Sequence, residues 1–124
     1  MGRLPDAELE IMLIIWEAKE PVSTGDIMEK LEGNKSWHIS TVLKLLSRLS
    51  ERGFIKNEKQ GRFNRYTALV DEEEYRERET KSFMEKLHGN SFQSLVASLY
   101  NSHSITNKDI EEIAEILKRG GEQK

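Results

Sequence analysis

The sequence predicts a mainly α-helical protein with a small β-hairpin. Two observations predict this fold class. Hydrophobic residues recur at helical spacing in six stretches, and a segment between the third and fourth of them alternates like a pair of strands. The length of 124 residues suits one small domain with an appended region, or one extended domain.

The first helix is expected over Asp6–Lys19. Pro5 suits the start of a helix, Asp6 can cap its free N–H groups, and Pro21 ends it. The apolar stripe at helical spacing consists of Leu9, Met12, Leu13 and Trp16. Acidic residues, Glu8 among them, are expected on the other sides of this helix.

The second helix is short. Ser23, followed three residues later by Asp26, is close to a capping box. Gly33 and Asn34 are expected to stop this helix because both tolerate a left-handed backbone. Its apolar side consists of Ile27, Met28 and Leu31.

The third helix is expected from about Ile39 to Arg52, with Gly53 as its stop. His38, just before it, is interpreted as a capping or phosphate-facing group. The buried stripe consists of Val42, Leu45, Leu46 and Leu49. The residues away from that stripe are Thr41, Lys44, Ser47, Arg48 and Glu51.

A two-stranded hairpin follows. Its first strand begins at Phe54 and Ile55, Gln60-Gly61 provides the turn, and the segment from Phe63 returns. Glycine at the tip supplies the positive φ that hairpin turns require. The tip is basic and consists of Lys59, Gly61 and Arg62.

Three further helices follow Leu69. The first is acidic and has Tyr75, Glu79, Phe83 and Leu87 in register, and the second covers about Phe92–Tyr100. The third is expected to be capped by Asn107 and ended by Gly120-Gly121. Each of these helices is short, and together the three cannot enclose a core within one chain, so we expect a second copy to supply the missing surface.

Positive charge is concentrated in one part of the chain. Residues 35–70 carry a net charge of +6, whereas residues 1–34 carry −5 and residues 71–124 carry −4. Three helices followed by a basic hairpin form the winged variant of helix-turn-helix. We therefore predict a winged-helix DNA-binding domain over residues 1–70 and a helical dimerisation domain over residues 71–124. Thr41, Lys44 and Arg48 form the exposed strip that would enter the major groove, with Ser40 at its start, and Arg62 would reach the neighbouring backbone or minor groove.

The chain resembles the BlaI/MecI family of penicillinase repressors over nearly its full length. The resemblance rests on LPDAELEIMLIIWE, WHISTVLKLLSRLSERGFI, KQGRFNRYTALV and SFQSLVASLY. Trp37 and the hairpin sequence GRFNRY are its most specific parts.

This resemblance implies a homodimeric repressor that binds a palindromic operator of β-lactam-resistance or related genes. It places Ser40, Thr41, Lys44 and Arg48 on the recognition helix and Arg62 in the wing. It implies an interlocked dimer core made by Phe83, Leu87, Leu95, Val96, Leu99, Ile110, Ile113 and Leu117.

Two departures from the family pattern concern the inducing signal. Some members sense copper through C-terminal cysteines, and this chain has no cysteine. Others are inactivated by proteolysis at an Asn–Phe bond, and the corresponding position here is Ser98-Leu99. The sequence therefore excludes the copper cluster and leaves open whether a membrane sensor protease acts on this chain.

Other classes of function find little support. The three histidines are far apart and have no companions at metal-ligand spacing, so no metal or other cofactor is expected. No nucleophile, paired carboxylate or phosphate loop indicates an enzyme. The short apolar run IMLII matches neither a signal peptide nor a membrane span, so we expect a cytoplasmic protein without membrane insertion.

The rival interpretation is a winged-helix protein-interaction module without specific DNA binding. The negative total charge of −3 would suit such a module. Charge placement distinguishes the two, because a docking domain has no reason to gather +6 within residues 35–70.

Overall fold

The computed structural model describes residues 2–32 and 36–122, and it confirms the predicted fold class. The elements in chain order are α1 (Asp6–Glu17), α2 (Thr24–Leu31), α3 (Ile39–Glu51), β1 (Ile55–Gln60), β2 (Phe63–Ala68), α4 (Glu72–His88), α5 (Phe92–Asn101) and α6 (Asn107–Glu122). In the part of the chain that the structure describes, none of these helices has the length and apolar character to cross a membrane.

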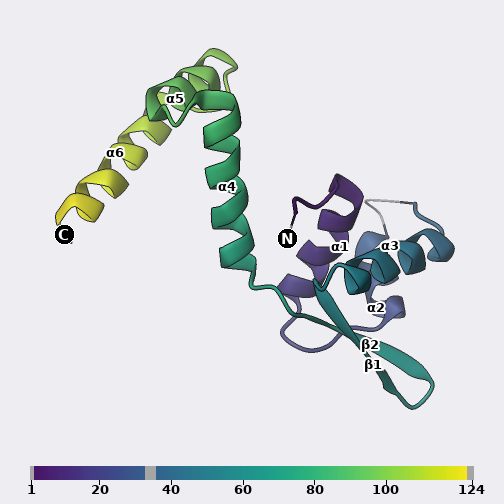
Figure 1. The fold of residues 1–124 in the computed structure, drawn as a ribbon. Helices are drawn as coiled ribbons and strands as arrows, with labels where there is room; N and C mark the ends of the chain where they lie inside the picture. The colour runs from purple at the N-terminus through teal and green to yellow at the C-terminus, as the bar shows by residue number, and fades with distance from the viewer. Residues whose placement is uncertain (1, 33–35, 123–124) are drawn as a thin grey trace. The chain divides into compact units, whose positions relative to one another are not determined.

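The chain divides into two compact units, residues 1–79 and residues 80–124, and the division falls inside α4. In the first unit, α1, α2 and α3 pack on one another, and the hairpin lies against α1 and α3 (Figure 1). The functions assigned to residues 1–70 and 71–124 stay predictions.

Helix α3 is held by one apolar face. Its buried residues are Val42, Leu45, Leu46 and Leu49, as the helical spacing predicts. They join a core that contains Ile11 and Met12 of α1, Ile27 of α2 and Phe54 at the start of the hairpin. Because the stripe is continuous, it fixes which side of α3 faces solvent.

The two strands of the hairpin pair antiparallel, with Ile55 opposite Ala68 and Gln60 opposite Phe63. The loop is therefore Gly61-Arg62, one residue later than the predicted Gln60-Gly61. Gly61 has φ +62°, and glycine at the first of two loop positions suits a type II′ turn. At the other end, Val22 and Tyr66 exchange backbone hydrogen bonds of 3.1 and 2.8 Å, which join the hairpin to the segment before α2.

The buried face of α1 agrees only in part with the predicted one, because Met12 is buried and Leu9 and Trp16 pack against the core, but Leu13 does not. Glu8, Ile11, Met12 and Ile15 are buried, whereas Leu13 is 46% exposed. The run IMLII places apolar residues all around the helix, so periodicity did not determine which face is buried. Asp6 is also not the cap, because the capping position is Pro5 and no side chain bonds the free N–H groups there.

Helix α2 has a complete capping box. The Asp26 N–H donates to Ser23 Oγ at 3.1 Å, and the Ser23 N–H donates to the Asp26 carboxylate at 3.0 Å. Arg65 of β2 lies 3.5 Å from the same carboxylate. The predicted stop at Gly33 and Asn34 lies outside the described residues.

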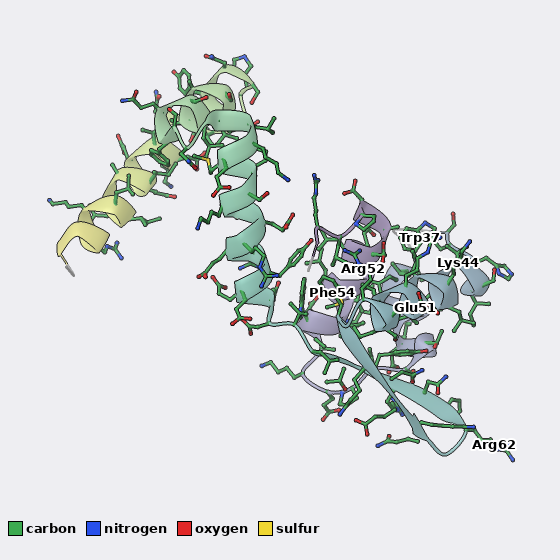
Figure 2. The ribbon with its side chains drawn as sticks, viewed as in Figure 1. Trp37, Lys44, Glu51, Arg52, Phe54 and Arg62 are labelled. Atoms are coloured by element: carbon green, nitrogen blue, oxygen red, sulfur yellow. The ribbon has the colours of Figure 1, made fainter. Side chains whose placement is uncertain are left out.

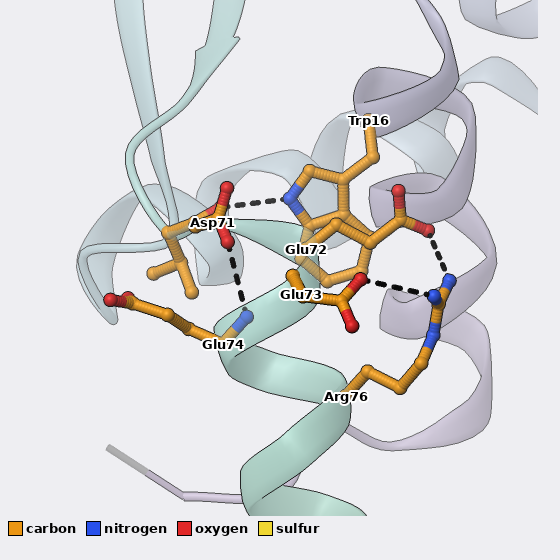
Figure 3. Close-up of polar contacts among 7 residues, drawn as sticks. Trp16, Asp71, Glu72, Glu73, Glu74 and Arg76 are labelled. Carbon is orange, nitrogen blue, oxygen red and sulfur yellow. Dashed lines mark hydrogen bonds and ion pairs between the residues drawn. The ribbon is translucent and has the colours of Figure 1, made fainter. Parts of the chain in front are cut away.

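The first turns of α4 belong to the core of the first unit. Tyr75 is buried, its ring contacts those of Trp16 and Phe54, and its hydroxyl accepts the Leu4 N–H at 2.8 Å. The Trp16 indole donates to the Val70 carbonyl at 2.8 Å, and the Asp71 carboxylate accepts the Glu74 N–H at 3.1 Å. Figure 3 shows Trp16, Asp71 and Glu74 at the start of α4. Residues after Val70 thus complete this core.

In the second unit, two predicted helix ends are wrong. Thr106 caps α6 instead of Asn107, through reciprocal hydrogen bonds with Asp109 at 2.8 and 3.2 Å. Helix α6 continues through Gly120 to Glu122, so the glycine pair does not end it. A glycine weakens a helix by only about 1 kcal/mol relative to alanine, which is too little to stop one by itself.

We predict that Asp26→Asn destabilises the fold at neutral pH but not in acid. The Ser23 backbone hydrogen bond, helped by the Ser23 hydroxyl and Arg65, holds the pKa of Asp26 below its ordinary value. The stabilisation from this lowered pKa is complete above the ordinary pKa and is lost as pH falls through the lowered one. The thermal midpoint of Asp26→Asn should therefore lie below that of the wild type at neutral pH, and this gap should close in acid. Glu20→Gln, in an exposed loop, is the control, and a gap that persists unchanged in acid would contradict the prediction.

Candidate nucleic-acid interface

All four predicted residues of α3 are exposed on its outer side: Ser40, Thr41, Lys44 and Arg48. The buried stripe faces the opposite way, so these side chains share one solvent-facing strip. Figure 2 shows Lys44 on this helix and Arg62 at the far end of the hairpin, extending away from the fold.

His38 caps the start of α3, which confirms the capping interpretation. Its ring nitrogen Nδ1 accepts the Ser40 backbone N–H at 3.2 Å and lies 2.9 Å from Ser40 Oγ. The Ser40 hydroxyl is therefore held against the imidazole at the end of the strip. The packing of Trp37 against the core fixes the segment that leads into the helix.

The basic residues around α3 fall into two groups. Arg52, Lys56 and Arg65 form ion pairs with Glu8, Glu58 and Asp26. By contrast, no side chain that the structure describes forms an ion pair with Lys44, Arg48, Lys59 or Arg62. The charges of this second group remain available to phosphate or to base edges. Lys35, which was counted in the predicted footprint, lies outside the described residues.

Arg52 has a structural role that sequence reasoning missed. Its guanidinium lies 3.7 Å from the Glu8 carboxylate, donates to the Arg3 carbonyl at 3.2 Å and stacks 5.3 Å from the Phe54 ring centroid. Glu8 is only 3% exposed, and its Oε1 has no hydrogen-bond donor among the described residues. Arg52 therefore supplies the compensating positive charge for a buried acid.

The hairpin tip presents Arg62 beside an exposed aromatic residue. Phe63 directly follows Arg62 and is one of the most exposed large hydrophobic residues of the first unit. Alternation along this strand places Phe63 on the face of Arg65 and Thr67, opposite the buried Tyr66, and this pattern could have predicted its exposure. The tip thus offers a cation on the two-residue loop and an aromatic ring on the first residue of β2.

The predicted dimerisation residues lie on α4, α5 and α6 and remain accessible. Phe83, Leu87 and Leu117 are exposed, and the others are partly exposed: Leu95, Val96, Leu99, Ile110 and Ile113. Three further exposed apolar residues lie outside the predicted dimerisation set, namely Phe92, Tyr100 and Ile116. A shallow hollow of about 510 Å³ between α5 and α6 is lined by Phe92, Val96, Tyr100 and Ile110 among others.

The Ser98-Leu99 bond lies inside α5, in its last two turns. Ser98 is exposed and Leu99 is partly buried. A peptide bond in a regular helix has its backbone hydrogen-bonded, so cleavage at this bond requires local opening of the helix.

Comparison with known proteins settles the family. The penicillinase repressor family model matches residues 4–119. The chain belongs to the penicillinase repressor family. It is 32% identical to the methicillin resistance regulatory protein MecI of Staphylococcus aureus over 116 residues, which cover 94% of each chain. The family consists of transcriptional repressors rather than enzymes, and the resemblance seen in the sequence is confirmed.

Two solved structures confirm the winged-helix fold of the first unit. The DNA-binding domain of the repressor BlaI matches with a TM-score of 0.53 and 33% identity, and the match covers 59% of this chain and 88% of that one. The monomeric form of Bacillus licheniformis BlaI, in complex with the blaP half-operator, matches with a TM-score of 0.51 and 32% identity. That match covers 60% of this chain and 89% of the BlaI chain.

We predict that changing Lys44 and Arg48 together to Ala weakens DNA binding and flattens its salt dependence. Each phosphate contact that is lost reduces the slope of log K against log salt by about 0.9. Anisotropy titrations of the full chain with a random-sequence duplex across a salt series measure this slope. Lys19→Ala, an exposed cation after α1, is the control and keeps the slope. Unchanged affinity and slope in the double variant would remove α3 from the interface.

Proposed function

We propose that this repressor binds a palindromic DNA operator as a homodimer, with α3 of each copy in the major groove. The observation that carries the proposal is the one-sided α3, which buries its apolar stripe and presents unpaired Lys44 and Arg48 to solvent. The BlaI structure with a half-operator supports this orientation, because its fold matches the first unit.

Recognition helices of this class use their N-terminal residues to contact base edges. Ser40, Thr41 and Lys44 occupy that half of α3, and Arg48 follows one turn later. Arginine can bond a guanine edge with two hydrogen bonds, whereas the shorter polar groups suit adenine, thymine or phosphate. We assign base reading to this strip. Glu51, at the other end of α3, is assigned no base contact.

The second unit supports the dimer. Among its described side chains none is buried, although α4, α5 and α6 all carry large apolar residues. Pairing with a second copy would bury these residues and complete a core. In a dimer the two DNA-binding units are tethered, so binding of the second half-site becomes intramolecular. This raises the affinity by about 10² to 10⁴.

The proposed regulated genes are those of β-lactam resistance or related functions, in keeping with the names of the MecI and penicillinase repressor relatives. We propose cytoplasmic action, and release from DNA when the second unit is opened by proteolysis or by a ligand. A membrane sensor protease is the proposed agent of cleavage, and a gene for one beside this gene would support that route.

Selection of duplexes from a random-sequence pool by the full chain tests the whole proposal. We expect an enriched sequence with two inverted half-sites whose centres lie about 10 base pairs, or a multiple of this, apart. Enrichment of a single unrepeated site would contradict the dimer, and no enrichment would contradict sequence-specific binding.

We predict that Arg62→Ala weakens binding to the selected duplex without changing its base preference. Backbone and minor-groove contacts carry little sequence information, so all duplexes should lose affinity to a similar extent. Titration of the selected duplex and its single-base variants measures both quantities. Asn64→Ala, on the same hairpin, is the neutral control. A changed preference with intact affinity would place Arg62 elsewhere.

We predict that Leu87→Glu combined with Leu117→Glu turns the dimer into a monomer. Leu117 is 56% exposed in the single chain, so the charge there opposes pairing more than it opposes folding of one chain. Sedimentation at micromolar concentration should give the mass of one chain, and affinity for the two-half-site duplex should fall at least about tenfold. Leu69→Glu, at a residue that is 58% exposed in the first unit, is the matched control. A wild-type monomer that still binds the duplex tightly would contradict the proposal.

A further inference from the structure

Helix α3 has two exposed large apolar side chains, Ile39 at its first residue and Leu43 among the polar residues of its outer side. Leu43 is 44% exposed and lies between Ser40 and Ser47, its neighbours one turn before and one turn after. A single exposed leucine is ordinary on a protein surface. The position of Leu43 relative to the polar strip is what gives it significance.

Helix geometry places Leu43 as a counterpart of Arg48. With about 100° of rotation per residue, both lie about 70° from the line opposite the buried stripe, on opposite sides of that line. Lys44 and Ser47 lie about 30° from the same line, one on each side. A helix that enters a groove along this line therefore presents Arg48 to one flank and Leu43 to the other.

We propose that Leu43 reads thymine, by packing against the C5 methyl group of one thymine in each half-site. This inference rests on the proposed function, because it requires α3 to lie in the major groove. A leucine has no hydrogen-bond donor or acceptor for phosphate or for polar base atoms. The thymine methyl is the apolar group that a base pair exposes in the major groove.

The same geometry gives a physical reason why Leu43 would favour thymine over cytosine. Cytosine presents an N4 amino donor on its major-groove edge and has no methyl group. Leucine placed against that edge would cover a donor and leave it without a partner, which is unfavourable. Ile39, one turn before Leu43, lies about 40° closer to the buried face, so we assign the contact to Leu43 alone.

Replacement of thymine by uracil in the selected duplex tests the contact, because it removes the methyl group and leaves the Watson–Crick pairing intact. Each thymine is replaced in turn, and the affinity of the full chain is measured for wild type, Leu43→Ala and Leu13→Ala. Leu13 on α1 is 46% exposed and provides the matched control.

We expect one thymine in each half-site at which uracil weakens wild-type binding about three- to tenfold, the scale for burying one methyl group. Leu43→Ala should bind the thymine and uracil duplexes equally, and Leu13→Ala should behave like wild type. Placing 5-methylcytosine at that position should recover part of the loss caused by cytosine, for wild type only.

Two results would overturn the inference while leaving the proposed function intact. One is a wild-type protein that binds its duplex specifically but responds to uracil at no position. The other is a uracil effect that persists unchanged in Leu43→Ala. Failure of the wild type to select any duplex would reject the proposed function and this inference together.

Discussion

The burial of one face of α3 is the constraint on which the first unit depends. Val42, Leu45, Leu46 and Leu49 meet residues from α1, α2 and the start of the hairpin, so the helix cannot rotate about its axis without exposing leucine. The outward direction of every polar residue on α3 follows from this packing. A surface that reads another molecule needs such support, because side chains that bind are positioned only as well as the helix beneath them.

The same core is closed by residues far apart in the sequence. Tyr75 touches Trp16 and Phe54 and accepts the Leu4 N–H, so it joins the N-terminal segment, α1 and the hairpin start to α4. Arg52 adds a polar connection at the end of α3, where it faces the buried carboxylate of Glu8. Both interactions join elements that are far apart in the sequence, and helical periodicity within one element does not predict such contacts.

A hydrophobic pattern predicts the buried face of a helix well only when it fits a single face. Helix α3 has one apolar stripe that fits a single buried face, so its exposed polar residues could be predicted from the sequence, whereas the exposure of Ile39 and Leu43 was not predicted. Helix α1 contains the run IMLII, which fits more than one buried face, and the burial of Glu8 depends on Arg52 some forty residues later. The predicted end of α6 is wrong because glycine lowers the stability of a helix without removing its backbone hydrogen bonds. The roles of Lys44, Arg48 and Arg62 in binding remain predictions.

The lack of any buried side chain among the described residues 80–120 has a consequence for gene dosage. A unit that completes its core only by pairing has a stability that depends on protein concentration. Well below the dissociation constant of the proposed dimer, the number of dimers rises with the square of the number of chains. Occupancy of an unsaturated two-half-site operator by the proposed dimer would then respond steeply to synthesis and dilution, so halving the supply of the protein would lower that occupancy by more than half.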